Sequence, residues 1–150
     1  MPRPAKAFRS AKKALHALYD ELPGLDCKGL CQASCGKVGE AVAPLEADLI
    51  GAHMQAMGME APEDDPASKA CPLLTAHGTC SVHAERPLIC RLWGVVADEL
   101  MVCPWGCKPK RYMSNEETRA AYRKLQRISQ RYEEEMKPDG ESGEGQGDAD

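Results

Sequence analysis

The chain has 150 residues, the size of one domain, and a formal net charge of −4. Hydrophobic residues make up 43% of it, but this share includes eight cysteines, and there are only one Phe and two Trp. This composition excludes a large aromatic core, and no stretch approaches the roughly 20 apolar residues of a membrane span. A core this thin is usually reinforced by disulfides or by metal.

The charge is unevenly distributed along the chain. Residues 138–150 carry five acids and no base, so residues 1–137 have a formal net charge of +1. We therefore expect neither nucleic acid nor an anionic membrane as a partner. The basic start of the chain contains no apolar run of the kind found in signal peptides, which predicts a cytoplasmic protein with reduced cysteines. A disulfide framework is the alternative use of eight cysteines.

Residues 5–20 predict an amphipathic helix. Apolar side chains recur there every three or four positions, at Phe8, Ala11, Leu15, Leu18 and Leu22. Lysines and arginines cover the opposite surface, and Pro23-Gly24 ends the pattern. We interpret the basic surface as a solvated helix face, because no interleaved aromatic residues offer stacking platforms for bases.

The first group of cysteines follows at once, with Cys27, Cys31 and Cys35 separated by three residues each. This spacing places the three sulfurs on one face of a helix, or lets a loop wrap around an ion. Gly29 and Gly36 favour the loop. Although a buried cysteine also behaves as a small apolar side chain, three thiols this close together indicate metal ligands.

A second helix is predicted over residues 44–57. Pro44 suits the first helical position, where its missing N–H costs nothing. One face is lined by Leu45, Leu49, Ala52 and Ala56. An acidic loop with two prolines follows over residues 60–68 and separates this helix from the remaining cysteines.

The second group of cysteines comprises Cys71, Cys80, Cys90, Cys103 and Cys107. Along the whole chain, successive cysteines are separated by 3, 3, 35, 8, 9, 12 and 3 residues, so the C-x2-C knuckle of common zinc fingers is missing. Zinc and iron–sulfur clusters both take soft thiolate ligands, usually four for each site. Eight cysteines therefore provide for two such sites, or for one larger site with bridging sulfurs.

The last part of the folded chain predicts a short hairpin and a third long helix. Val95-Val96 and Met101-Val102 flank a polar turn, which indicates a small hairpin over residues 95–102. Ser114-Asn-Glu-Glu117 is a capping box that opens a helix over residues 114–137. Its apolar positions are Ala121, Leu125, Ile128, Tyr132 and Met136.

Pro138 ends this helix, and residues 138–150 have the composition of a disordered acidic tail. Residues 1–137 therefore predict a mainly α fold, a small irregular single domain organised around cysteine-ligated metal.

Three segments of the second group resemble the YkgJ-like cysteine-cluster family. They are Cys71-Pro-Leu-Leu, Cys80-Ser-Val-His and Arg86-Pro-Leu-Ile-Cys90-Arg91, against a family pattern of C-x-x-L, C-x-I/V-Y/H and R-P-x-x-C-R. The resemblance covers residues 24–112 and implies a small cytoplasmic protein whose cysteines ligate zinc, iron or an iron–sulfur cluster. The family's first group reads C-x2-C-x2-C-C, whereas this chain has C-x3-C-x3-C. Because of this departure, the resemblance does not fix the number or the arrangement of the metals in this chain.

Arg86 and Arg91 flank Cys90, and we expect both to support the metal site from outside its ligand set. Four thiolates around one zinc carry net negative charge, which guanidinium groups offset through N–H···S contacts. Ordinary ion pairs with Glu85 or Asp98 are the alternative. His77 and His83 lie in the same stretch, but eight thiols already fill two sites.

The predicted function is binding of an iron–sulfur cluster or zinc through all eight cysteines. The metal is expected to be needed for folding, with a redox or metal-handling role and a protein partner still to be identified. The alternatives are an enzyme whose cluster activates a substrate and a metal-stabilised regulatory module. The radical-SAM motif C-x3-C-x2-C does not match, and the chain is too short for the accompanying barrel.

Overall fold

The structure is a computed structural model that describes residues 3–140, apart from residues 28, 30–31, 33–34 and 64. The fold is mainly α, as predicted, and no strand occurs among these residues. Its elements are α1 (Arg3–Asp20), η2 (Gly39–Ala41), α2 (Pro44–Ala56), η3 (His83–Glu85), α3 (Leu88–Leu92), η4 (Glu99–Met101) and α4 (Asn115–Met136). Within the described part of the chain, none of the helices combines the length and apolar character needed to span a bilayer. The predicted tail falls mostly on residues 141–150, outside the described residues.

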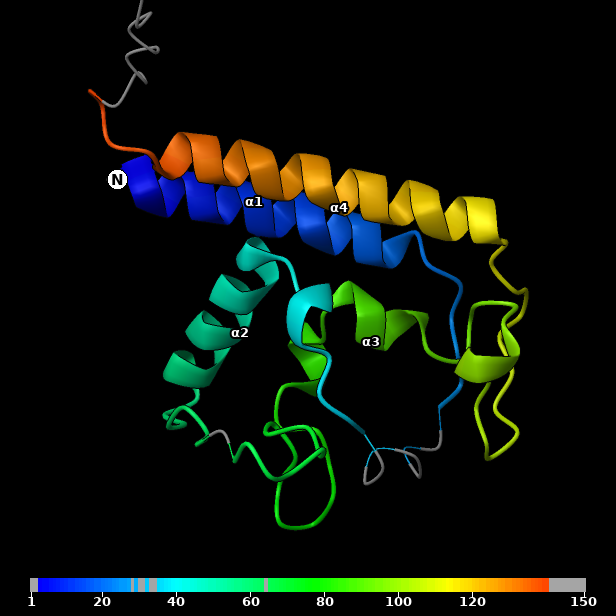
Figure 1. The fold of residues 1–150 in the computed structure, drawn as a ribbon. Helices are drawn as coiled ribbons and strands as arrows, with labels where there is room; N and C mark the ends of the chain where they lie inside the picture. The colour runs from blue at the N-terminus through cyan, green and yellow to red at the C-terminus, as the bar shows by residue number, and fades with distance from the viewer. Residues whose placement is uncertain (1–2, 28, 30–31, 33–34, 64, 141–150) are drawn as a thin grey trace, which may run out of the picture.

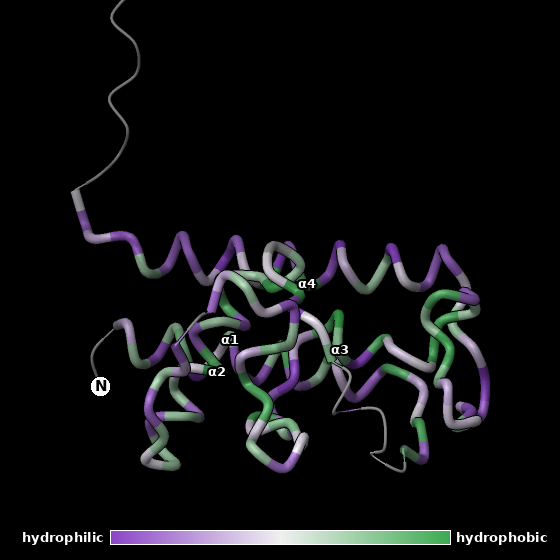
Figure 2. Tube along the Cα trace, turned by 60° about the horizontal axis from the view of Figure 1, so that its bottom comes forward, coloured by the Kyte–Doolittle hydropathy of each residue, from purple (hydrophilic) through white to green (hydrophobic). Residues whose placement is uncertain are grey.

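The two long helices, α1 and α4, form one layer of the molecule. They lie side by side and antiparallel, so that the start of α1 is next to the end of α4 (Figure 1). Phe8 packs edge-on against Tyr132, with ring centroids 6.3 Å apart. The Ser114 hydroxyl accepts from the Glu117 N–H at 3.1 Å, which confirms the predicted start of α4. Hydrophilic and hydrophobic stretches alternate along α4, as expected for a helix with one buried face (Figure 2).

Beneath this layer lie α2, α3 and the loops (Figure 1). The main core forms where α1, α2, α3 and α4 meet, and its fully buried leucines are Leu15, Leu45, Leu88 and Leu92. A smaller cluster forms farther along α2 from Ile50, Met54 and Val82, with Leu73 and Cys80 packed against it. The buried face of α2 therefore includes Ile50 and Met54, whereas Ala56, predicted on that face, is exposed.

The segment predicted as a hairpin reverses direction without forming strands. The Gly94 N–H donates to the Met101 carbonyl at 2.6 Å, and η4 makes the turn. Val95 and Ala97 pair instead with Met113, through backbone bonds of 2.7 and 3.2 Å. This pairing buries Val95, Val96 and Met113 in the main core. The free energy gained by burying these apolar side chains favours the pairing with Met113 over a hairpin within residues 95–102.

Candidate metal centre

Backbone hydrogen bonds hold three of the predicted ligands in neighbouring segments. The Cys71 N–H donates to the Cys35 carbonyl at 2.9 Å, beside a bridge between residues 36 and 70. The chain then turns back on itself, with a bridge between Leu74 and Cys80. The Cys80 N–H donates to the Gln32 side-chain oxygen at 2.7 Å. Residues more than 30 positions apart in the sequence are thereby brought to one place.

Cys90 joins these three from α3. Burial raises its pKa to about 11, and the nearby charges of Cys71, Cys35 and Cys80 contribute to the rise. Burial also raises the pKa of Cys35, followed by the charges of Cys71 and Cys80. Four thiols from four segments therefore lie close enough for a thiolate at one to disfavour ionisation at another.

The donor set fits a soft metal ion. In the described part of the chain, the charges that shift the pKa values of Cys35 and Cys90 come only from thiols and from Arg86. Thiolates without competing carboxylates are what zinc and iron–sulfur clusters select. No three His, Cys, Asp or Glu side chains of the described residues already converge as ligands.

Arg86 and Arg91 occupy different places around this group. The charge of Arg86 lowers the pKa of both Cys35 and Cys90, which places its guanidinium near these thiols. Arg91 instead lies over the ring of Tyr19, 4.0 Å from its centroid. Its guanidinium donates to the carbonyls of Arg86 and Ala84, at 2.7 and 2.9 Å. Arg91 thus braces the backbone that carries Arg86.

The remaining described cysteines lie around Leu25. Residue 25 forms a bridge with residue 109, two positions after the buried Cys107, and the Cys27 N–H donates to the Leu25 carbonyl at 2.9 Å. A Cβ built on Gly94 would lie 3.8 Å from the Cβ of Cys103 and 2.8 Å from Leu25. Cys27, Cys103 and Cys107 are therefore drawn toward one segment. Cys31 lies outside the described residues.

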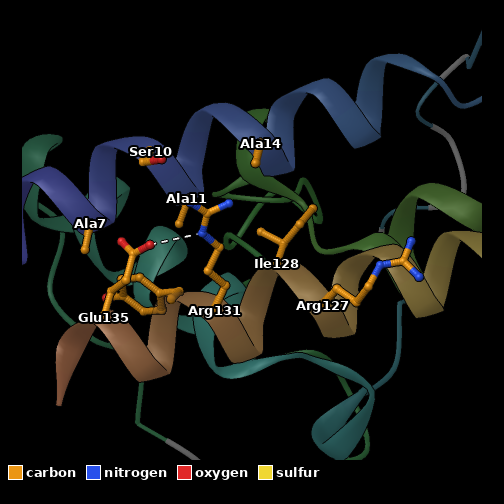
Figure 3. Close-up of a pocket in the computed structure, with 9 residues that line it drawn as sticks. Ala7, Ser10, Ala11, Ala14, Arg127, Ile128, Arg131 and Glu135 are labelled. Carbon is orange, nitrogen blue, oxygen red and sulfur yellow. Dashed lines mark hydrogen bonds and ion pairs between the residues drawn. The ribbon is translucent and has the colours of Figure 1, made fainter.

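Two cavities formed by described residues bear on where a metal could bind. One, of about 200 Å³, is lined by a single cysteine, Cys27, together with Arg86, Arg91, Tyr19 and Trp93, among others. The other, of about 190 Å³, lies between α1 and α4 (Figure 3). It opens where small residues of α1 face the Arg131–Glu135 ion pair of 3.1 Å, and its lining contains neither Cys nor His. The second cavity is therefore unsuited to metal.

Sequence reasoning missed two residues that shape this region, Glu46 and Gln32. Glu46 is 1% exposed and accepts three hydrogen bonds, from the Tyr19 hydroxyl, from the Leu88 N–H and from the Ala43 N–H at the cap of its own helix. Its role as the third residue of a capping box was hidden because Ala43, not Ser or Thr, occupies the cap. Gln32 lies between Cys31 and Cys35, and nothing in the sequence except this position indicated that it has a structural role.

Comparison with known families agrees with the chemistry of the cysteines. The family model described as "Putative zinc- or iron-chelating domain", with the pattern CxxCxxCC, matches residues 26–108, which is more than half of the chain. No curated protein and no solved structure matches the chain. The chain belongs to the CxxCxxCC family of zinc- or iron-chelating domains.

Proposed function

We propose that the eight cysteines form two thiolate sites, and that metal in these sites is required for the fold. The first site comprises Cys35, Cys71, Cys80 and Cys90; the second comprises Cys27, Cys31, Cys103 and Cys107. The protein then serves in metal handling or electron transfer in a reducing compartment such as the cytoplasm, where thiols stay available for metal.

The observation that carries the proposal is the grouping of the first four thiols. Cys71 is bonded through its backbone to Cys35, and all three other thiols contribute to the raised pKa of Cys90. A thiol whose pKa is raised in this way stays protonated at neutral pH when no metal is bound. A bound metal reverses this, because a coordinated thiol is held deprotonated.

The position of Leu25 supports this division between the sites. Cys27, Cys103 and Cys107 are related to this residue, its bridge partner Pro109 and Gly94, rather than to the first four thiols. Cys31 completes the second site by its spacing from Cys27 in the sequence.

Arg86 and nearby apolar side chains complete the first site. A four-thiolate site bears negative charge, and Arg86 lies near enough to Cys35 and Cys90 to offset it. Leu73, Leu74, Leu88 and Ile89 are buried or partly buried and limit access of water. Trp93, next to this segment, is 45% exposed.

For the metal, we favour iron–sulfur clusters in the cell and zinc in protein prepared in air. Cys71 and Cys103 each precede a proline, a pairing also found in bacterial ferredoxin motifs. Zinc binds the same all-thiolate ligand sets and has no redox chemistry. The metal identity therefore decides whether electron transfer is available to this protein.

Serine variants of single cysteines test the two-site division. The measurement is metal per chain by elemental analysis of protein purified without oxygen. Cys35→Ser, Cys71→Ser, Cys80→Ser and Cys90→Ser should lose the same fraction of the metal, and Cys27→Ser, Cys103→Ser and Cys107→Ser the other fraction. His77→Ala is the matched control, since it alters an exposed side chain in the same loop and should retain all metal. Loss of one common fraction in Cys35→Ser and Cys107→Ser would contradict the division.

A further inference from the structure

We infer that Glu46 is the positioning residue of the four-thiolate site, because its buried carboxylate fixes α3 and with it Cys90. The inference rests on the proposed function and adds to it a residue that binds no metal. Glu46 is only 1% exposed. A carboxylate can be buried to this degree only when its oxygens accept hydrogen bonds.

The first contact of Glu46 reaches the start of α3. This helix has only five residues, and Pro87 at its cap offers no side-chain hydrogen bond. The Leu88 N–H therefore lacks an acceptor within its own segment, and it donates to Glu46 Oε1 at 2.7 Å. Cys90 follows two residues later, so the carboxylate from α2 sets where this thiol lies.

The same oxygen also accepts from the Tyr19 hydroxyl, at 2.7 Å. Arg91 lies over the ring of Tyr19 and donates to the carbonyls of Ala84 and Arg86. The R-P-x-x-C-R segment is thus held twice: at Leu88 directly, and at residues 84–86 through Tyr19 and Arg91.

The second carboxylate oxygen ties Glu46 to its own helix. Oε2 accepts from the Ala43 N–H at 3.0 Å, which is the half of a capping box that an alanine cap allows. Both oxygens are engaged, so the side chain has a single orientation. Loss of a partner that hydrogen-bonds a metal ligand directly typically weakens metal binding by ~10–100-fold; Glu46 acts on Cys90 through the Leu88 backbone, so we expect an effect near the lower end of that range.

The test is a titration of the full chain with Co²⁺, followed by competition with Zn²⁺. Glu46→Ala removes all three hydrogen bonds, and we expect at least ~10-fold weaker binding. We also expect a weaker thiolate-to-cobalt absorption, because Cys90 no longer completes the site. Glu46→Asp keeps the charge but shortens the reach, and it serves if Glu46→Ala does not fold. Glu46→Gln retains an oxygen for Tyr19 and Leu88, so it should recover most of the affinity.

Asp48→Asn is the matched control. Asp48 lies on the same helix and accepts from the Tyr132 hydroxyl at 2.9 Å, a contact that joins α2 to α4 and does not involve α3. Its variant should bind Co²⁺ with wild-type affinity and spectrum. Wild-type binding by folded Glu46→Asp or Glu46→Ala would overturn the inference, as would an equal loss in Asp48→Asn. A wild-type chain that takes up no Co²⁺ through cysteine would instead overturn the proposed function.

Discussion

Tyrosine hydroxyls donate to carboxylates at two places where the helices of this protein meet. Tyr19 at the end of α1 donates to Glu46, and Tyr132 near the end of α4 donates to Asp48. Both acceptors lie in the first half of α2, so this helix is tied to each long helix by one specific bond. In both cases burial and the neighbouring carboxylate raise the pKa of the tyrosine.

Replacing Tyr132 by Phe tests this arrangement. The variant should lose about 1 kcal/mol of unfolding free energy at neutral pH, the usual value of a hydrogen bond. The pKa of Tyr132 rises from 10.0 to about 12 in the fold. Its stabilising effect is therefore complete below pH 10 and is lost as the pH rises toward 12.

Denaturant unfolding at pH 7 to 12 measures both effects. The wild-type protein should lose more stability than Tyr132→Phe between pH 10 and 12. Tyr19 and Tyr122 have raised pKa values in both proteins, so the difference reports Tyr132. Equal losses of stability in the two proteins would show that folding does not raise the pKa of Tyr132.

At the scale of elements, periodicity predicted the helices well and the connections poorly. Residues 5–20 and 114–137 were predicted as helices, and they form α1 and α4. Apolar residues spaced three and four apart lie on one face of a helix, and that face can be buried against whichever element packs on it. The cysteine loops have no periodic signal, and their arrangement depends on contacts such as Cys71 with Cys35 that span 36 positions. Glu46 could not be identified either, because its partners lie on other elements.

Gly94 follows α3 at a position that requires glycine. Its φ is +85°, and a Cβ there would lie 2.8 Å from a Leu25 methyl carbon. Gly94→Ala should therefore destabilise the protein by about 1–3 kcal/mol, through backbone strain and the displaced leucine. Gly51→Ala is the control, since it lies in the interior of α2 with open space around its Cβ.

Thermal unfolding of both variants checks this prediction. Gly51→Ala should be neutral or stabilising by up to about 1 kcal/mol, because alanine favours the helix. A Gly94→Ala protein as stable as Gly51→Ala would contradict the close packing of Leu25 on the turn.

At the scale of the whole molecule, the helical core stabilises only part of the chain. The main core joins α1, α2, α3 and α4, whereas the loop that carries Cys71 and Cys80 packs on a small cluster of Ile50, Met54 and Val82. Metal ligation supplies folding free energy in small domains of this kind. The proposed metal therefore holds together the part of the molecule that lacks its own apolar interior.

Removal of the metal should accordingly loosen the loops first. Cys90→Ser, or treatment of the wild type with a chelator, should lower the thermal midpoint by more than ~10 °C, given the size of metal ligation energies. Near-ultraviolet circular dichroism of the tryptophans and tyrosines follows the loss of tertiary structure. A Cys90→Ser protein that has lost the metal of the first site but melts as the wild type does would refute the requirement for metal.

Deletion of residues 138–150 should leave metal content and thermal midpoint unchanged. The segment carries five acids and no base and has no apolar face to bury. Elemental analysis and a melting curve of the shortened chain, compared with the full chain, check this. A lower metal content after deletion would show that the acidic segment takes part in the site.

Metal analysis together with the visible absorption spectrum, on protein purified without oxygen, tests the central claim most directly. We expect stoichiometric iron and sulfide, a brown protein with broad absorption near ~400 nm, and bleaching by dithionite. Colourless protein with stoichiometric zinc would keep the thiolate sites and remove electron transfer. Protein that holds neither metal while all eight cysteines are reduced would contradict the account.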